Sequence, residues 1–515
     1  MSDAVDRGIT VTEIAAMDQP IDATPETTAA FVGRALRGPL NTPVLVRNFG
    51  EFRRRFGGSW TRSSLGPAVE QFFEHGGRQL YVVRVANGAR GAMICLPANG
   101  SALVLRAVEP GSSESIRAAI DYDGIDPEDD EHFNLTLQRT SPDTHFVIDQ
   151  EFYRRVSCVE GADRFVAVAL LASSIARVDA PLPAQRPEAT RAPGNRYDTS
   201  YVGHTQAGTD GCGLSDYDLI GSKAQGTGLF ALDGVDPLDI VYLPPTARHM
   251  DTGPTALLAA ELYCRERHAV LIADPPSQWT DAQDAVLGAR ATGLASPNIV
   301  SYFPRLRRRI EQDGEPRVAG GAISGLLCKL DRTHGPWQDL DQQGLGLSRN
   351  LKPACDIDEE DLDSLHRAGI NAVITGPAGR ARVSGGVTLA RGSEEHSLFR
   401  SLAVRRLCLH IVKRIDQATR WAVFEKQDAD LALKIGEQIR AYFGDLVGLG
   451  AFENDRFLVQ CDAGLARRAD ELEHGVTLLL GFHPSGSRHA VLLTLHQTAR
   501  GCKVASAAFA PAGLP

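Results

Sequence analysis

The sequence predicts a multidomain protein of mixed α/β class, in which a central parallel sheet carries an inserted, mainly β domain and short terminal β-strands. Between residues 239 and 303, apolar strand-like runs alternate with amphipathic helical runs in the order β-α-β-α-β, which is typical of a parallel sheet with right-handed crossovers. Between residues 88 and 200, short alternating runs dominate instead, as in a β domain. The 515 residues correspond to about three domains at roughly 150 residues each.

Changes in pattern divide the chain into six expected segments. They are an N-terminal linker arm at 1–27, the first part of the core at 28–87, the inserted mainly β domain at 88–200, a central α/β domain at 201–395, a C-terminal α/β domain at 396–486, and a C-terminal arm and tail at 487–515. Prolines at 20 and 25 separate the first short strand from the core, and prolines between 181 and 193 form a linker after the insertion.

The first part of the core has strand runs that are apolar throughout, as expected for a sheet covered on both faces. One of its helices carries Leu65, Val69 and Phe72 on one face and ends before Gly76-Gly77. The expected strands are 29–33, 43–46 and 80–85, and the expected helices are 49–56 and 65–74. In the insertion the expected strands are 102–105, 115–120, 133–137 and 144–148.

The remaining elements follow from the same two periodicities. In the central domain we expect strands at 239–243, 269–273, 298–303, 370–374 and 381–383, and helices at 255–267 and 281–292. In the C-terminal part we expect helices at 397–419 and 430–447, and strands at 421–425, 457–461, 475–482 and 490–498. The small, Ala- and Pro-rich residues 499–515 are expected to be a disordered tail.

Composition excludes several classes of protein. Lys and Arg number 54 against 64 Asp and Glu, and this net charge of −10 argues against a general nucleic-acid binder. The longest apolar run, 165–172, has about eight residues, whereas a membrane-spanning helix needs about 20. The first residues show no secretory signal pattern. The nine cysteines form no C-x-x-C pair, which favours reduced, mostly buried thiols over disulfides or zinc.

A search for catalytic motifs finds no nucleotide-binding loop, no G-x-S-x-G and no H-E-x-x-H. The stretch Asp251-Thr252-Gly253 resembles the aspartate loop of a subtilisin, and His334 and Ser384 follow in the order that such a triad requires. Neither residue has the expected surroundings, so helix capping is the favoured role of Asp251. His483 and His489 are interpreted as part of a solvated hairpin. We therefore expect no catalytic, cofactor-binding or metal-binding residues.

Charge clusters offer a second kind of site. The basic residues are Arg53, Arg54, Arg55, Arg305, Arg307, Arg308 and Arg309; the acidic ones are Asp356, Asp358, Glu359, Glu360, Asp361 and Asp363. They form either solvated faces or patches that meet between copies of the chain. In the second case many repeated contacts are needed, because an exposed ion pair contributes only about 0.2–1 kcal/mol.

A set of motifs in this order resembles the contractile tail sheath family, which includes phage tail sheaths, R-type bacteriocins and extracellular contractile injection systems. The matching stretches are 28–46, 71–78, 81–85, 228–232, 274–276, 368–371, 404–407 and 419–425. They lie within residues 8–87 and 215–498, and the insertion matches more loosely.

The resemblance implies a non-enzymatic subunit that stacks as six-fold rings around an inner tube and contracts to drive that tube through a target cell envelope. It implies a central subtilisin-like sheet without the catalytic triad, and an inserted domain on the outside of the particle. The implied partners are further copies of the chain, the inner tube protein, and baseplate and tail-terminator proteins, with no nucleic acid, cofactor or membrane insertion. The subunit would be made in the bacterial cytoplasm.

The family links its subunits through terminal arms that add strands to a neighbour's sheet, and the chain has short strands that fit this role. The N-terminal candidate contains Ile9, Val11, Glu13 and Ile14, and the C-terminal candidate contains Val491, Leu493 and Leu495. The candidate charge contacts between subunits are Arg305, Arg307, Arg308 and Arg309 with Asp358, Glu359, Glu360 and Asp361.

Two alternatives remain. The first is a subtilisin-like serine hydrolase that uses Asp251, His334 and Ser384. The second is a homologue of secretion sheaths that are built from two chains. The presence of both the N-terminal and the C-terminal motifs in one chain argues against it.

Overall fold

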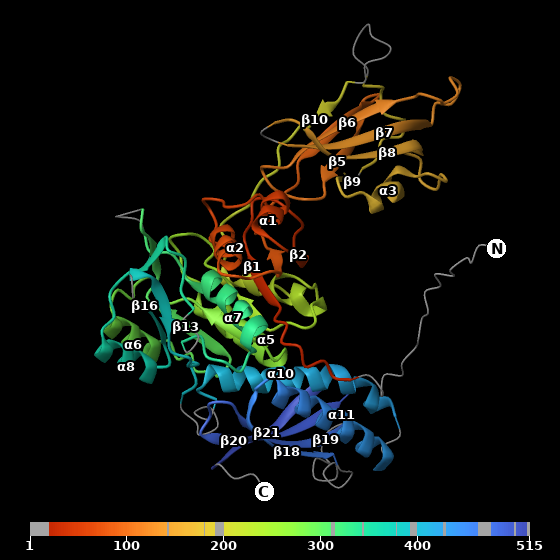
Figure 1. Ribbon diagram of the computed structural model, residues 1–515. Coiled ribbons are helices and arrows are strands. Elements are labelled where there is room, and N and C mark those ends of the chain that lie inside the picture. The colour runs from red at the N-terminus through yellow and green to blue at the C-terminus, as the bar shows by residue number, and fades with distance from the viewer. Residues whose placement is uncertain are drawn as a thin grey trace, which may run out of the picture.

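The computed structural model describes residues 20–141, 144–179, 181–190, 200–310, 315–341, 345–376, 379–391, 399–425, 429–461, 475–498 and 501–511. Three parts follow one another along the long axis of the molecule (Figure 1): a β domain at one end, a central α/β part, and a C-terminal α/β part at the other end. Helix α10 (Leu402–Thr419) lies between the last two parts.

The central part contains an eight-stranded sheet with the order β17-β16-β13-β12-β11-β1-β3-β2. Its inner strands are parallel, and the two edge strands β2 and β17 run antiparallel to their neighbours. The strands are β1 (Ala29–Gly33), β2 (Val44–Val46), β3 (Leu80–Arg84), β11 (Ile240–Tyr242), β12 (Val270–Ala273), β13 (Ile299–Phe303), β16 (Asn371–Thr375) and β17 (Ala381–Ser384). Segments far apart in the sequence thus share one sheet.

Helices cover both faces of this sheet, so its strands are buried on both sides, as their apolar runs predict. Phe31 and Tyr242 point toward one helical layer, and Ala30 and Val241 point toward the other. The first layer contains α1 (Phe49–Phe56), α2 (Leu65–Glu74) and α7 (Gly320–His334). The second contains α4 (Asp216–Ile220), the 3₁₀ helix η3 (Gly228–Gly234), α5 (Pro254–Glu266), α6 (Ala282–Ala291) and α8 (Glu359–Arg367).

Helix α7 was not expected from the sequence, because its first half is rich in glycine and serine. The structure gives these small residues a packing role. A Cβ atom on Gly321 would lie 2.2 Å from the carbonyl oxygen of Ala68 in α2, and one on Gly325 would lie 2.4 Å from that of Phe72. The two helices can therefore approach closely only because α7 lacks side chains here.

The inserted domain consists of two antiparallel sheets that enclose a separate core. One sheet has the order β10-β6-β7-β8 and the other the order β4-β5-β9. The elements are β4 (Met93–Ala98), β5 (Ser101–Ala107), β6 (Ser115–Asp121), β7 (His132–Thr140), β8 (Val147–Ser157), α3 (Val166–Ala169), η2 (Leu170–Ala172), β9 (Ala176–Asp179) and β10 (Val202–Gly203). Its two connections to the centre pair with each other, for example Asn87 with Cys212.

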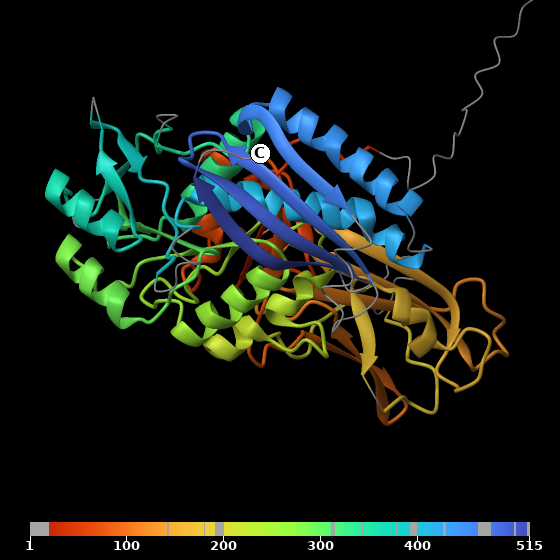
Figure 2. The same ribbon diagram turned by 90° about the horizontal axis from the view of Figure 1, so that it is seen from below.

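The C-terminal part is a four-stranded antiparallel sheet of order β18-β19-β20-β21 that packs on helices α10 and α11. Figure 2 shows this sheet in front of α10. The elements are the 3₁₀ helix η5 (Arg420–Phe424), α11 (Ala429–Gly448), β18 (Phe452–Cys461), β19 (Gly475–Pro484), β20 (His489–Thr498) and β21 (Gly501–Pro511). A two-stranded sheet of β14 (Leu306–Arg308) and β15 (Leu351–Pro353) adjoins the centre.

Most expected elements are confirmed, and three expectations are wrong. The strand expected at 144–148 begins only at Val147 and continues to Ser157. Residues 421–425 do not form a strand, because the 3₁₀ helix η5 (Arg420–Phe424) continues directly from the end of α10 at Thr419. The expected disordered tail contains strand β21, because it pairs with β20 and packs Cys502, Ala507 and Phe509 against the core of the C-terminal part. The predicted strand at 9–14 lies outside the described residues.

Candidate assembly surfaces

Residues 22–28, which lead from the N-terminal segment into β1, are fixed by one face of α10. Arg414 of that helix donates a hydrogen bond to the carbonyl of Thr24 (2.9 Å), and its guanidinium lies 3.8 Å from the Asp22 carboxylate. The backbone N–H of Thr28 donates to Asp239 (2.8 Å), which also forms an ion pair with Lys413 of α10. The path of the chain is therefore set before it enters the sheet.

A second ion pair joins α10 to the central helices. Arg406 pairs with Asp331 of α7, whose side chain is completely buried and also accepts a hydrogen bond from the hydroxyl of Thr27. Burial raises the pKa of the Asp331 carboxyl. Burial also acts to raise the pKa of Asp239, but the charge of Lys413, together with the hydrogen bonds from Lys413 and from the N–H of Thr28, lowers that pKa overall.

These anchoring residues were missed by the sequence analysis. Arg406, His410, Lys413 and Arg414 are spaced at i, i+4, i+7 and i+8, which places them on one face of an otherwise apolar helix. That spacing was visible in the sequence, but their acidic partners come from distant segments. His410 is buried among these cations, and burial lowers its pKa to about 3.

The C-terminal candidate residues lie inside a sheet rather than on a free arm. Val491, Leu493 and Leu495 belong to β20, are at most 1% exposed, and point into the core of the C-terminal part. Strand β20 pairs with β19 on one side and β21 on the other, both from the same chain. The expectation of a free arm at 491–495 is therefore wrong for this structure, because the chain folds back and completes its own sheet.

Strand β21 is the edge of this sheet among the described residues, so one row of its main-chain groups has no strand partner there. The N-terminal candidates Ile9, Val11, Glu13 and Ile14 lie outside the described residues. The described residue nearest to them along the chain is Pro20, and Ile21 after it packs in the core of the C-terminal part.

The structure corrects part of the basic cluster. Arg305 is 8% exposed; it donates two hydrogen bonds to the carbonyl of Pro275 (3.0 and 2.9 Å) and pairs with Asp251. It is thus an internal brace and not an inter-subunit contact. Arg308 and Arg309 are exposed: Arg308 lies 3.8 Å from Glu70, and Arg309 donates to the carbonyl of Gly379. Arg307 is half-buried between them and the core.

The acidic cluster has a local structural role. Asp358 is the N-cap of α8 and accepts a hydrogen bond from the N–H of Asp361 (2.8 Å). Glu359, Glu360 and Asp361 occupy the first turn, where negative charge complements the helix dipole. Glu359 and Glu360 are nevertheless exposed and have room to contact another molecule.

The residues of the hydrolase alternative do not form a triad. Asp251 accepts hydrogen bonds from the N–H (2.9 Å) and hydroxyl (3.0 Å) of Ser277, and Ser384 donates to Asp341 (3.4 Å). Helix α7 begins at Gly320, beside Asp274 at the carboxyl end of β12, and ends at His334. Its 15 residues span about 20 Å, so His334 lies toward the amino ends of the strands, whereas Asp251 lies at their carboxyl ends.

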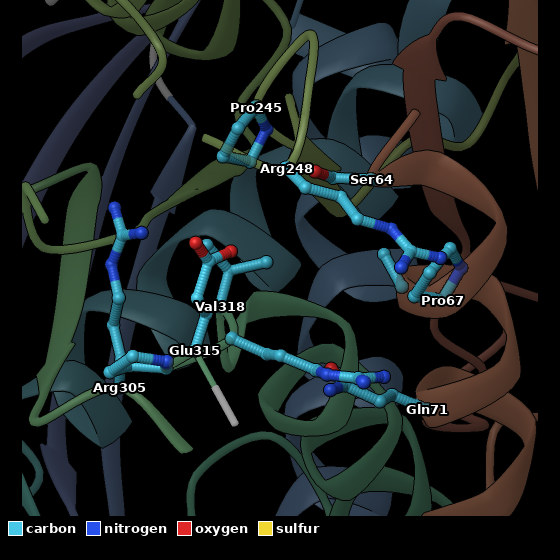
Figure 3. Close-up of a pocket in the computed structure, with 11 residues that line it drawn as sticks. Ser64, Pro67, Gln71, Pro245, Arg248, Arg305, Glu315 and Val318 are labelled. Atoms are coloured by element: carbon cyan, nitrogen blue, oxygen red, sulfur yellow. The ribbon is translucent and has the colours of Figure 1, made fainter. Parts of the chain in front are cut away.

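A cavity of about 150 Å³ lies at the carboxyl ends of the parallel strands, a position where open α/β sheets bind ligands. Figure 3 shows Arg305 on one side of it and Gln71 and Pro67 of α2 on the other. The side-chain oxygen of Gln71 is buried, with no hydrogen-bond partner among the described residues. The lining of the cavity carries three basic residues, Arg248, Arg305 and Arg317, and one acidic residue, Glu315.

Other kinds of site are not seen in the part of the chain that the structure describes. There, no group of His, Cys, Asp and Glu is arranged to hold a metal ion. No described helix combines the length and apolarity needed to cross a membrane. All nine cysteines are free thiols, and burial raises the pKa of Cys158 and Cys355, both to about 11.

Comparison with known proteins gives one relative by sequence. No model of a known protein family matches the chain. The tail sheath protein of the Vibrio phage KVP40 is 30% identical over 143 residues, which are 28% of this chain. The match spans only about a fifth (21%) of that relative's length.

The likeness in fold extends over nearly the whole chain. A sheath tail protein from Listeria innocua superposes with a TM-score of 0.63 at 12% identity, over 94% of this chain and 98% of that one. A sheath tail protein from Desulfitobacterium hafniense gives 0.56 at 11% identity, over 95% and 100%. The contracted sheath of an extracellular contractile injection system, PVC, gives 0.53 at 12% identity, over 95% and 96%. The resemblance to contractile sheath proteins is thus confirmed, and this chain shares the fold of these sheath proteins.

Proposed function

We propose that this chain is the structural subunit of a contractile tail sheath, which polymerises around an inner tube and contracts to drive that tube through a target cell envelope. The observation that carries the proposal is the shared fold over 94% of the chain with a sheath tail protein, of which 98% is matched. The role is non-enzymatic, and the central sheet is interpreted as a subtilisin-type sheet without a triad.

The subunits are linked by their terminal segments. The N-terminal strand with Ile9 and Val11 adds to the sheet of a neighbouring copy, since main-chain hydrogen bonds to a sheet edge give affinity with few demands on side chains. On the C-terminal side, the exchangeable segment is β21 and not β20, because β21 is the edge strand. Head-to-tail links of this kind propagate as a helix when they do not close into a ring.

Contraction repacks rigid parts rather than refolding them. This is supported by the separate hydrophobic cores of the inserted domain, the centre and the C-terminal part. It is also supported by the ion pairs of Arg406 and Lys413, which hold α10 to the centre. Of the charged candidates, Arg308, Arg309, Glu359 and Glu360 remain available for contacts in the contracted lattice.

The partners in this proposal are further copies in stacked six-fold rings, an inner tube protein, and baseplate and tail-terminator proteins. The subunit is made in the bacterial cytoplasm and becomes part of a phage tail or a related particle. The inserted domain lies on the outer surface of the particle, consistent with its projection from one end of the subunit (Figure 1).

Negative-stain electron microscopy of the full chain, expressed alone and together with its tube protein, tests the proposal. Long hollow tubes are expected from the full chain, and their loss is expected when residues 1–20, or all residues after Thr498, are deleted. Monomers under both expression conditions would contradict the proposal.

A further inference from the structure

We propose that the cavity beside Ser64, Gln71 and Arg305 is a binding site for a small organic carboxylate. The polar side chains hold the carboxylate group, and the apolar part of the wall holds a short carbon body. The cavity has a volume of about 150 Å³ and lies at the carboxyl ends of the parallel strands. The inference is independent of the proposed function, because it concerns side chains within one subunit and not the way in which subunits assemble.

Three deeply buried polar side chains line the cavity. Ser64, Gln71 and Arg305 are 6%, 8% and 8% exposed, respectively. Ser64 is the N-cap residue of α2, but its hydroxyl does not cap the helix. The hydroxyl of Ser63 accepts the N–H of Leu65 instead (3.0 Å). The Ser64 hydroxyl is therefore available to a ligand.

The other two side chains also have unused hydrogen-bond donors. In Arg305, Nε and Nη2 donate to Pro275 and Asp251, whereas Nη1 has no partner among the described residues. The Gln71 amide has no hydrogen-bond partner in the described part of the chain either, so no neighbour fixes which of its two polar atoms faces the cavity. Buried polar groups without partners are rare in folded proteins, and three that share one cavity indicate a ligand.

The charges around the cavity favour an anion. The charge of Arg305 is balanced by its ion pair with Asp251. Among the other described side chains of the lining, two are basic and one is acidic: Arg248, Arg317 and Glu315. The N-terminal end of α2 also borders the cavity and has no acidic residue in its first turn. The positive end of the helix dipole therefore adds to the excess of basic residues.

The remaining wall selects the body of the ligand. It is formed by apolar side chains, and Val318 lies between Arg305 on one side and Gln71 on the other (Figure 3). The other apolar residues are Pro67, Ala68, Pro245 and Pro316. An apolar cavity of about 150 Å³ in another protein binds benzene, so the space here suits a body of about that size. A carboxylate as large as benzoate is therefore the expected ligand.

Binding of para-fluorobenzoate to the full chain, followed by fluorine NMR, tests the inference. The measurement uses free subunits, so its result does not depend on polymerisation. We expect saturable binding that benzoate competes away, and at least ten-fold weaker competition by benzamide, which lacks the charge, and by inorganic phosphate, which lacks the apolar body. No saturable binding at millimolar concentrations, or equal competition by all three compounds, would overturn the inference.

Two variants place the ligand in this cavity. Q71L removes the buried amide, and R248S removes a cation from the exposed rim. The matched control is R265S, an exposed position in the last turn of α5 that does not line the cavity. We expect at least ten-fold weaker binding by Q71L and R248S and unchanged binding by R265S. Unchanged binding by both cavity variants would overturn the inference.

Thermal unfolding without ligand provides a second readout for Q71L. Its midpoint should be equal to that of wild type or higher, because the substitution removes a buried polar group that has no partner. A lower midpoint would assign Gln71 a structural role and overturn its part in the site. Binding of para-fluorobenzoate should also persist in assembled tubes. Its loss on assembly would overturn a free small molecule as the ligand, in favour of an acidic side chain of a neighbouring copy.

Discussion

Asp331 of α7 and Arg406 of α10 form a buried ion pair that joins the central sheet part to the C-terminal part. The same carboxylate accepts a hydrogen bond from Thr27, so this pair also fixes the segment that leads out of the N-terminal region. One buried carboxylate therefore connects three segments that are far apart in the sequence.

Substitution of Asp331 by Asn should destabilise the chain strongly. Arg406 would be left as a buried, unpaired charge, and breaking such a pair typically costs about 3–5 kcal/mol. Replacement of both residues, as in D331L/R406M, should cost less than D331N alone, because no charge is left buried. Urea unfolding followed by circular dichroism measures both free energies, and equal stability of D331N and wild type would contradict the structural role.

Stability should fall as the pH drops below about 6.5, in part through His75. This side chain is buried, its Nδ1 lies 2.7 Å from the carbonyl of Gln71, and its Nε2 accepts the N–H of Ser348 (2.9 Å). Burial lowers its pKa, so the unfolded state takes up a proton at a higher pH than the folded state does.

The loss begins as the pH falls through the unfolded value and stops below the folded pKa, at up to about 1.4 kcal/mol per pH unit for each such histidine. Urea unfolding between pH 7.5 and 5.0 tests this, with H75N as the comparison because it cannot titrate there. The variant should show a shallower slope than wild type. Identical slopes would mean that His75 is not held neutral.

Gly321→Ala should destabilise the central part. The added Cβ would lie 2.2 Å from the carbonyl oxygen of Ala68, and overpacking of this kind typically costs about 1–3 kcal/mol. Gly444→Ala in α11 is the matched control, since nothing lies within 4 Å of its Cβ position, and it should be neutral or stabilising by up to about 1 kcal/mol. Thermal unfolding gives the melting temperature of each variant. A similar change in melting temperature for both variants would show that α2 and α7 do not pack so closely.

A serine-directed fluorophosphonate probe should not label Ser384. That residue is 4% exposed, its hydroxyl donates to Asp341, and the His366 ring beside it contacts the Ser384 carbonyl oxygen (Nε2 at 3.4 Å) rather than the hydroxyl. Mass spectrometry after incubation with the probe gives the result, with the S384A variant as the control. Labelling that S384A abolishes would revive the hydrolase alternative.

Reversal of the exposed basic pair, R308E/R309E, should leave the fold intact and weaken the contracted lattice. These side chains make only peripheral contacts within the subunit, so circular dichroism should be unchanged. Electron microscopy of contracted sheaths, with salt titration, should show disassembly at lower ionic strength than for wild type. Normal assembly and contraction would remove this cluster from the proposed interface.

The sequence by itself determined the local elements and the class of protein. Periodicity indicated strands β1, β3, β11, β12 and β13 and helices α2, α5 and α6, because each buries a regular set of apolar residues. Motif order indicated the resemblance to sheath proteins. Helix α7 was missed because close packing against α2, and not an apolar face, explains its glycines.

Only the tertiary structure decided how the charged residues and the C-terminal strands are used. Arg305 and Arg308 belong to the same basic run, yet one is a buried brace and the other is exposed, because the first meets Asp251 and Pro275 from other loops. Strand β21 carries only a few apolar residues, Cys502, Ala507 and Phe509 among them, and its position depends on the edge of β20 and the core beneath it. The contact partners of these charged residues and of β21 depend on the path of the whole chain. Local sequence does not encode that path.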